Sequence, residues 1–225
     1  MQKISYMCKK PYFYFKVLLN KNDLFKIENN LNCTVFIPNK NYSKVFLESV
    51  NDFLLNGDSI NISNKEVLIK SETENTYLLI SGVKNQSQKS LFSITRSENH
   101  YRVKKPWGHE LWIEGKNEKY VFKEIYLKKN FRTSLQYHNF KEETNFIFSC
   151  KLDYYSTTID NLDKIKSYQM ITNEFVHVKP KIVHRFKALE DSYLYETSTS
   201  HLDDVIRIAD DTNREDGRIE EEHTK

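Results

Sequence analysis

Cysteine is rare in this chain of 225 residues, and so are glycine, proline and tryptophan. The three cysteines, Cys8, Cys33 and Cys150, are odd in number and none of them forms a CxxC pair. Disulfide-rich secreted domains and zinc knuckles both depend on paired or closely spaced cysteines. The cysteine pattern therefore argues against both classes and favours a reduced, cytoplasmic protein.

The chain also lacks a strong excess of charge and a long apolar run. Its 34 basic and 31 acidic residues give a formal net charge of +3, which provides no electrostatic footprint for nucleic acid. No apolar stretch approaches the roughly 18 residues needed to span a bilayer. The first residues lack a clean apolar core followed by a small-residue cleavage site. We therefore expect no nucleic-acid partner and no membrane association.

The chain does contain many short apolar and aromatic runs of strand length. Apolar residues make up 39% and aromatic residues 13% of the sequence, enough for a substantial core. Runs such as 13–19, 65–70 and 192–198 are β-branched or aromatic and are bounded by Asn, Asp, Lys or Gly. Helical periodicity is weak, with one turn expected within 20–30 and a short helix within 201–211. The sequence predicts an all-β protein of small sandwiches or barrels.

A polar stretch near residues 84–100 separates the strand-rich segments into two halves. We expect residues 1–90 to form one β domain and residues 91–225 to form a second, which carries the site.

The two halves share one local pattern. Residues 57–68 and 173–184 each contain a turn, alternating apolar residues and a second turn. The later segment ends on His184, where the earlier one ends on Leu68. This similarity suggests an internal duplication whose first copy has lost its polar residue.

The chemically informative residues lie in the second half. Gln136, His138 and Phe140 occupy alternate positions, so on a strand their side chains would face the same way. Glu143 follows in the next turn, and His184 lies just after a Pro-containing turn. Two imidazoles and a carboxylate commonly hold a divalent ion such as Zn, Fe, Mn, Ni or Co. On spacing alone, a hydrogen-bonded core histidine is the commoner explanation.

Four ordered motifs are present within residues 102–214. The matching residues are Pro106, Trp107, Gly108, Lys123, Arg132, Ser134, Leu135, Gln136, His138, Glu143, Pro180, His184, Arg185, Asp203, Asp204 and Arg207. In this order they resemble the cupin domain of bacterial type II mannose-6-phosphate isomerases. The same domain forms the C-terminal part of the bifunctional mannose-1-phosphate guanylyltransferases. The resemblance implies a double-stranded β-helix (cupin) barrel. Because the first half has strands but no such motifs, it implies a bicupin with a degenerate N-terminal half.

The resemblance also implies a bound divalent metal: Zn, Mn, Fe, Ni or Co. The implied ligands are Gln136, His138, Glu143 and His184. Phe140 stands where cupins usually place a second histidine, and it cannot coordinate a metal, so Gln136 or water would complete the set. Cys150 and Lys181 stand where the family has glycine, which affects loop geometry more than ligation.

The implied reaction is an aldose–ketose isomerisation of a sugar phosphate, which moves a proton between C1 and C2 through a cis-enediol. Lys123 and Glu143 are both candidates for the base, and the sequence does not choose between them. The expected catalytic residues are Lys123, Glu143 and Arg207. The expected substrate-binding residues are Arg132, Arg185, Trp107 and Asp204, in which guanidinium groups would bind the phosphate.

Three functions stay open at this point. The first is a metal-dependent sugar-phosphate isomerase of carbohydrate or surface-polysaccharide metabolism. The second is a cupin that binds a sugar nucleotide or polysaccharide intermediate without a metal, which Phe140 favours. The third is an iron-dependent oxygenase, because two histidines and a carboxylate also form an iron(II) triad. The resemblance further leads us to expect a homodimer.

Overall fold

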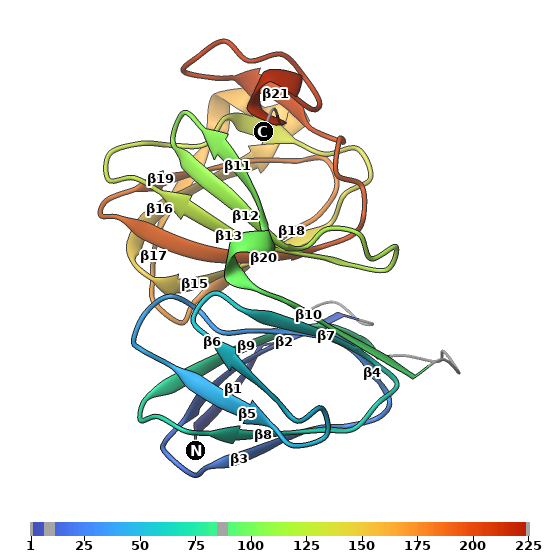
Figure 1. The fold of residues 1–225 in the computed structure, drawn as a ribbon. Helices are drawn as coiled ribbons and strands as arrows, with labels where there is room; N and C mark the ends of the chain where they lie inside the picture. Colours follow the sequence, from blue (N-terminus) through green and yellow to red (C-terminus); the bar gives the residue numbers. More distant parts are fainter. Residues whose placement is uncertain (1, 7–11, 85–89, 224–225) are drawn as a thin grey trace. The chain divides into compact units, whose positions relative to one another are not determined.

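Strands account for most of the chain in the computed structural model, which describes residues 2–6, 12–84 and 90–223 (Figure 1). The all-β prediction is therefore confirmed. The chain divides into two units, Met1–His100 and Tyr101–Lys225. Cys8 lies outside the described residues. No helix among the described residues is long and apolar enough to cross a membrane.

The first unit consists of two antiparallel sheets. The larger sheet has the order β1 (Gln2–Tyr6), β2 (Tyr12–Leu19), β9 (Thr76–Lys84), β4 (Leu31–Phe36), β7 (Ser59–Ser63) and β10 (Leu91–Thr95). The smaller sheet has the order β3 (Leu24–Ile27), β8 (Val67–Ser71), β5 (Lys44–Leu47) and β6 (Asp52–Leu55). Strand β10, which the expected boundary at residues 90/91 assigns to the second domain, pairs with β7 of this unit. A single 3-10 turn, η1 (Ser97–Asn99), follows it.

The second unit also consists of two antiparallel sheets. One sheet has the order β11 (Tyr101–Lys105), β12 (Gly108–Glu114), β13 (Val121–Leu127), β20 (Ser192–Ser198), β15 (Glu143–Ser149) and β18 (Phe175–Val178). The other has the order β17 (Lys166–Ile171), β16 (Lys151–Thr158), β19 (Ile182–Ala188), β14 (Leu135–Tyr137) and β21 (Ile206–Ala209). Two 3-10 segments complete it, η2 (Ile159–Lys164) and η3 (Glu220–His223).

The two units repeat one strand order. In the first unit β2-β9-β4-β7 faces β3-β8-β5-β6, and in the second β13-β20-β15-β18 faces β14-β19-β16-β17. In both sets of eight strands, consecutive strands alternate between the two sheets except at one hairpin, β5–β6 or β16–β17, which is the winding of a double-stranded β-helix. The expected bicupin architecture is therefore confirmed.

The interiors of the two barrels differ in chemistry. The first is filled by aliphatic side chains, among them the fully buried Val35, Val67 and Ile69. Leu68 is only half-buried, because it alternates with its two neighbours on β8. The inward position that corresponds to His184 is thus Val67 or Ile69 rather than Leu68. Either way, an aliphatic group stands where the second barrel has an imidazole.

Asparagine supplies many of the turn conformations in this glycine-poor chain. Among the described residues, the non-glycine positions with positive φ are Asn22, Asn51, Asn64, Asn75, Asn130, Asn173, Lys181 and Asn213. Asparagine tolerates the left-handed region better than most residues because its short side chain bonds to local backbone. Lys181, which stands where the resemblance expects glycine, adopts φ 66°.

Both expected helical segments are wrong. Residues 24–27 form β3, which pairs with β8, and Ile206–Ala209 form β21, which pairs with β14. In the second case the β-branched Ile206 and Ile208, on either side of Arg207, suit a strand as well as a helix, and pairing with a distant strand decides the outcome.

Gly108 has a steric reason to be glycine. Its φ is +152°, and a Cβ at this position would lie 2.0 Å from the carbonyl oxygen of Tyr126 on the neighbouring strand β13. We expect Gly108→Ala to lower the free energy of unfolding by about 1–3 kcal/mol, through strain and displacement of β12. Urea denaturation measures this change. The exposed Lys104→Ala on β11 is the matched control and should stay within about 0.5 kcal/mol; equal stability of the two variants would contradict the steric argument.

Candidate metal centre

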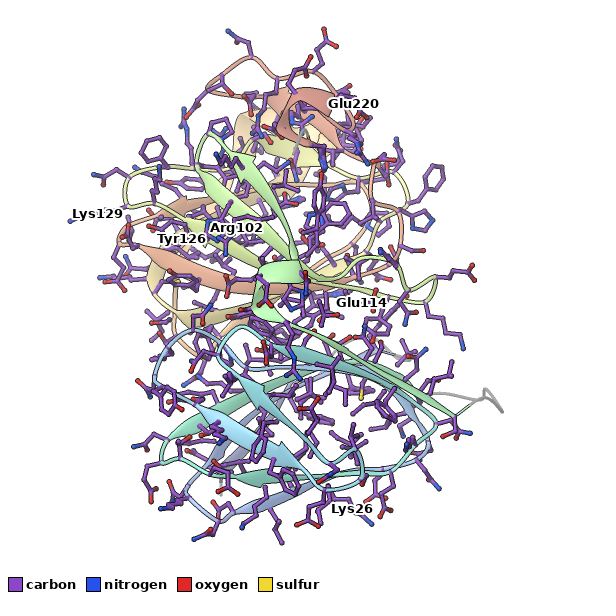
Figure 2. All side chains as sticks on the ribbon, in the orientation of Figure 1. Lys26, Arg102, Glu114, Tyr126, Lys129 and Glu220 are labelled. Carbon is purple, nitrogen blue, oxygen red and sulfur yellow. The ribbon has the colours of Figure 1, made fainter. Side chains whose placement is uncertain are left out.

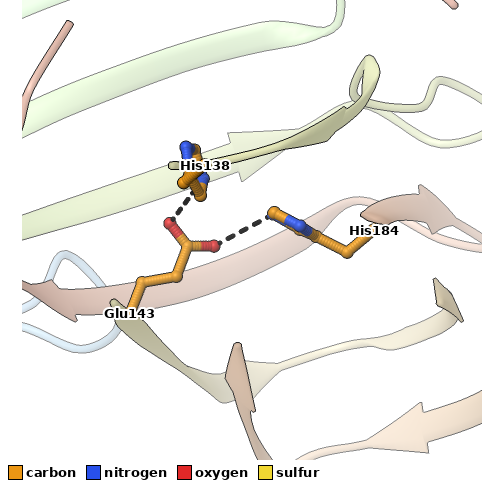
Figure 3. Close-up of side chains that lie close together, drawn as sticks. All are labelled: His138, Glu143 and His184. Carbon is orange, nitrogen blue, oxygen red and sulfur yellow. Dashed lines mark ion pairs between the residues drawn. The ribbon is translucent and has the colours of Figure 1, made fainter. Parts of the chain in front are cut away.

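Three buried side chains, His138, Glu143 and His184, converge inside the second barrel (Figure 3). The Nε2 atom of His138 lies 3.4 Å from Oε2 of Glu143, and Nε2 of His184 lies 3.2 Å from Oε1. One ligand atom from each residue falls within 4.8 Å of the others. The three residues are 0%, 4% and 2% exposed, so the cluster is shielded from bulk water.

Backbone pairing places these side chains. Glu143 opens β15, and His184 on β19 is the register partner of Gln136 on β14. His138 follows directly after β14, where its Nδ1 bonds to the backbone carbonyl of Asp204. Because the strands come from different parts of the chain, the triad forms only when the barrel closes.

Asp204 holds the loop that carries His138. Its carboxylate accepts backbone N–H bonds from Asn139, Phe140 and Lys141 at 2.9, 2.6 and 2.8 Å. Burial would raise the pKa of Asp204, but these three donors outweigh it and lower that pKa. The structure thus gives Asp204 a positioning role, whereas the resemblance implied contact with substrate.

Phe140 does not fill a ligand position. Its side chain is 69% exposed and its ring lies 6.0 Å from that of His201. The next residue, Lys141, turns inward instead, and its Nζ lies 2.5 Å from Oε2 of Glu143 and 2.8 Å from Oε1 of Glu196. A cationic side chain therefore reaches the cluster from the loop where cupins usually carry a second histidine.

Charge pairing keeps Glu143 ionised. Burial alone would raise the pKa of this carboxyl, but the Lys141 ammonium holds it well below its usual value. Burial would likewise lower the pKa of Lys141, and the carboxylates of Glu143 and Glu196 raise it above its usual value. Asn145 adds a neutral bond, with its Nδ2 donating to Oε1 of Glu143 at 3.0 Å.

The hydrogen bonds of the two imidazoles suit metal binding. His138 Nδ1 faces the carbonyl of Asp204, and His184 Nδ1 faces the carbonyl of Ile182 at 3.1 Å. A carbonyl only accepts, so each Nδ1 carries hydrogen and, in a neutral ring, each Nε2 presents a lone pair. The Nε2 of His138 is buried and has no hydrogen-bond partner.

Two Nε2 lone pairs and a carboxylate that face one another can together coordinate a positive ion between them. A divalent ion would fill this role, and such an arrangement of Nδ1 bonds is the usual way to orient histidine ligands. The triad therefore could hold a divalent metal. Gln136 lines the same cavity, and its Oε1 accepts a bond from Ser134 Oγ at 2.8 Å, which leaves one lone pair of that oxygen available.

The triad opens into a cavity of about 90 Å³ that also contains a second buried charge cluster. Lys123 Nζ lies 3.2 Å from Oε2 of Glu110 and 4.3 Å from the centre of the Trp112 ring. Trp112 Nε1 donates to the same oxygen at 3.0 Å, and Lys105 lies 3.7 Å from Oε1. Lys123, expected as a base, is therefore engaged as a cation.

The two expected substrate-binding arginines, Arg132 and Arg185, do not line the cavity. Arg132 forms a bidentate pair with Asp211, with Nε–Oδ2 and Nη2–Oδ1 distances of 2.8 and 2.7 Å, and its side chain is 45% exposed. Arg185 alternates with His184 on β19 and donates to the carbonyls of Thr133 and Ala209 at 3.0 and 3.3 Å. Both side chains are therefore occupied by other partners.

Of the expected catalytic and substrate-binding residues, four line the cavity: Trp107, Lys123, Glu143 and Arg207. Sequence reasoning missed Lys141, Asn145 and Glu196. The sequence feature that could have identified Glu196 is a charged residue at an inward position of an apolar strand, two residues after the buried Leu194.

The Glu110 cluster predicts a pH dependence of stability. Burial would raise the pKa of Glu110, but Lys123, Lys105 and the Trp112 N–H lower it below the usual 4.5. A depressed folded-state pKa stabilises the fold above pH 4.5, and this contribution disappears as the pH falls further. We expect Glu110→Gln to cost roughly 3 kcal/mol at neutral pH because it leaves buried ammonium groups uncompensated.

Below pH 4.5 the difference in the free energy of unfolding between the wild type and Glu110→Gln should become smaller. Urea unfolding across this range tests it, with the exposed Glu118→Gln as control. A difference that stays constant with pH would contradict the ion-pair explanation.

Comparisons with known proteins place the fold. No family model matches the chain, and no curated protein matches its sequence. Its structure is similar to that of Lactobacillus farciminis oxalate decarboxylase in a formate complex, with TM-score 0.66 and 8% identity over 88% of this chain and 79% of that one. A mutant of Bacillus subtilis oxalate decarboxylase gives TM-score 0.66 and 8% identity, over 88% and 71%.

A further structure, from work on the Mn(II) centres of the Bacillus subtilis enzyme, gives TM-score 0.63 and 7% identity over the same shares of the two chains. Likeness at this identity shows the fold alone. The chain has the cupin fold, in two barrels, with a His–Glu–His triad in the second that could bind a divalent metal.

Proposed function

We propose that this protein is a metal-dependent cupin isomerase that interconverts an aldose phosphate and a ketose phosphate, such as mannose 6-phosphate and its ketose. This would place it in carbohydrate or surface-polysaccharide metabolism. The observation that carries the proposal is the buried triad of His138, Glu143 and His184 beside a cavity lined by further acids and cations.

The ligands of the metal would be His138, Glu143 and His184, with Gln136 or water in addition. The bound ion would act as a Lewis acid that polarises the carbonyl and hydroxyl oxygens at C1 and C2 of the sugar. Lys141 would keep the site electrostatically balanced by pairing with Glu196 when Glu143 turns to the ion.

Glu196 is the proton-transfer group that the geometry favours. As a metal ligand, Glu143 would have its lone pairs engaged, and Lys123 is held as a cation by Glu110. Glu196 is 5% exposed and lines the cavity. Its Oε1 lies 2.8 Å from both Ser198 Oγ and Lys141 Nζ, so its Oε2 would be the atom that accepts the proton. Its carboxylate would take the proton from one carbon and return it to the next, as aldose–ketose isomerisation requires.

A second candidate function rests on Lys141. Its ammonium already lies 2.5 Å from Glu143, so it compensates the buried carboxylate without a metal. This favours a cupin that binds a sugar nucleotide or polysaccharide intermediate and contains no ion. The two candidates differ in metal content, which is directly measurable.

Elemental analysis of the purified protein tests the metal site. We expect about one divalent ion per chain in the wild type and loss of that ion in a His138→Ala, His184→Ala double variant. His177→Ala is the matched control, because His177 bonds to Thr144 and Glu142 and lies outside the triad. A metal-free wild type that Mn, Co, Ni and Zn leave unchanged in melting temperature would exclude the isomerase and favour the second candidate.

Substitution of Glu196 tests its role. We expect Glu196→Gln to lower kcat for mannose 6-phosphate isomerisation by about 10²–10⁴-fold while metal content is retained, because only proton transfer is lost. A coupled assay of the ketose product gives kcat. Glu118→Gln, exposed and on a loop, is the control and should keep wild-type kcat. Unchanged kcat in Glu196→Gln would assign the proton transfer to another residue.

A further inference from the structure

The C-terminal segment Asp216–His223, here called the strap, lies at the cavity of the second barrel. Gly217, Arg218, Ile219 and His223 are among the residues that line that cavity. The strap contains η3, which buries none of its residues. Figure 2 shows Glu220 on this segment, near the C-terminal end of the ribbon.

The carboxylate of Glu222 sits between two cations. Its Oε2 lies 2.7 Å from Nζ of Lys105, and its Oε1 lies 3.1 Å from Nη1 of Arg214. The side chains of Lys105 and Arg214 are 9% exposed and that of Glu222 is 11% exposed. One negatively charged group from the strap is thus enclosed by two nearly buried positive groups.

Arg214 and Lys105 each have a second carboxylate partner besides Glu222. Arg214 pairs with Asp210 at 2.6 Å, and Lys105 lies 3.7 Å from Glu110, which it shares with Lys123. Without Glu222, the three cations of this cluster face two carboxylates. One positive charge is then left over, which an incoming anion would neutralise.

The remaining contacts of the strap are mostly polar, and two of them anchor its start: Asp216 Oδ1 accepts the backbone N–H of Arg207 at 2.6 Å, and the Gly217 N–H donates to the carbonyl of Val205 at 2.8 Å. The hydroxyl of Tyr101 bonds to Nδ1 of His223 at 2.9 Å, and the His223 ring meets that of Trp112 edge-on at 5.8 Å. Arg207 donates to the carbonyl of Gly217 at 3.0 Å. The η3 end of the strap buries none of its residues, so this end can detach at low free-energy cost while Asp216 and Gly217 stay bound.

We propose that Lys105 and Arg214 form a binding subsite for the oxyanion group of a small polar ligand, and that Glu222 of the strap occupies this subsite until the ligand displaces it. Guanidinium and ammonium groups together recognise a phosphate or a carboxylate in this way. The subsite lies in the same cavity as the triad, so a ligand anchored here by its anionic group would extend towards Glu143. The subsite requires no metal, and it stands whether or not the protein is an isomerase.

Intrinsic fluorescence reports on the strap directly. The chain contains two tryptophans, Trp107 and Trp112; both line the cavity, and Trp112 contacts His223. The full-length, EDTA-treated protein is titrated at constant ionic strength with mannose 6-phosphate, with oxalate and with neutral mannose. The two anions separate a phosphate from a carboxylate as the preferred group, and mannose shows any binding that needs no anion.

Glu222→Gln removes the internal competitor while keeping the shape of the side chain. We expect it to bind the preferred anion about tenfold more tightly than the wild type, because the competent, strap-free state is more populated. Glu220→Gln is the matched control: its carboxylate is on the same segment, is 76% exposed and pairs with Arg218. It should bind like the wild type.

Lys105→Met should abolish anion binding in both the wild-type and the Glu222→Gln backgrounds. Equal affinity of wild type, Glu220→Gln and Glu222→Gln would overturn the proposal, and so would an affinity for mannose equal to that for both anions. If Glu222→Gln does not fold, the loss of binding in Lys105→Met alone decides for the subsite, and retained binding decides against it.

Discussion

The ionised carboxylate of Glu143, buried in the second barrel, is the group on which the site depends. An unpaired charge in such a place is strongly unfavourable, so its surroundings must supply donors and positive charge. Lys141 supplies the charge at 2.5 Å, Asn145 supplies an amide, and two imidazoles complete the shell. Removal of any of these partners would leave the others without compensation, which explains why the polar interior is a connected cluster.

The same fold without that cluster is present in the first unit. There the strand order is repeated, but the interior is filled by aliphatic side chains such as Val35 and Ile69. Among the described residues of this unit, no group of histidine, cysteine or acidic side chains gathers that could hold a metal ion. The two barrels therefore differ in their interiors. The first contains an apolar core, whereas the second contains a smaller apolar core around Leu127 and Leu194 together with a polar cavity.

Alternating apolar residues predicted the strands from the sequence alone, whatever their partners. The residue types of His138, Glu143 and His184 made them candidate ligands, but the cupin barrel and the ligand set were predicted from the family resemblance. The direction of Arg132 was not accessible, because it depends on Asp211, which is distant in sequence. The direction of Arg185 follows from the sequence, because its neighbour His184 faces inward and side chains alternate along β19.

Long-range partners explain the other omissions. Lys141 lies in a loop whose path is set by Asp204. Glu222 and Lys105 form an ion pair although they lie near opposite ends of the second unit in sequence. Neither contact leaves a periodic pattern. The expected helix at 201–211 failed for the same reason, since β21 forms only against β14.

A metal ion and the Lys141 ammonium would compete for the same carboxylate, so metal affinity measures the central claim. A Mn(II) titration followed by the EPR signal of the free ion compares wild type, Lys141→Met and Glu143→Gln. We expect the wild type to bind Mn(II), Lys141→Met to bind it at least as tightly, and Glu143→Gln to lose the binding. Equal Mn(II) binding by wild type and Glu143→Gln, or none by either the wild type or Lys141→Met, would contradict a metal site centred on Glu143.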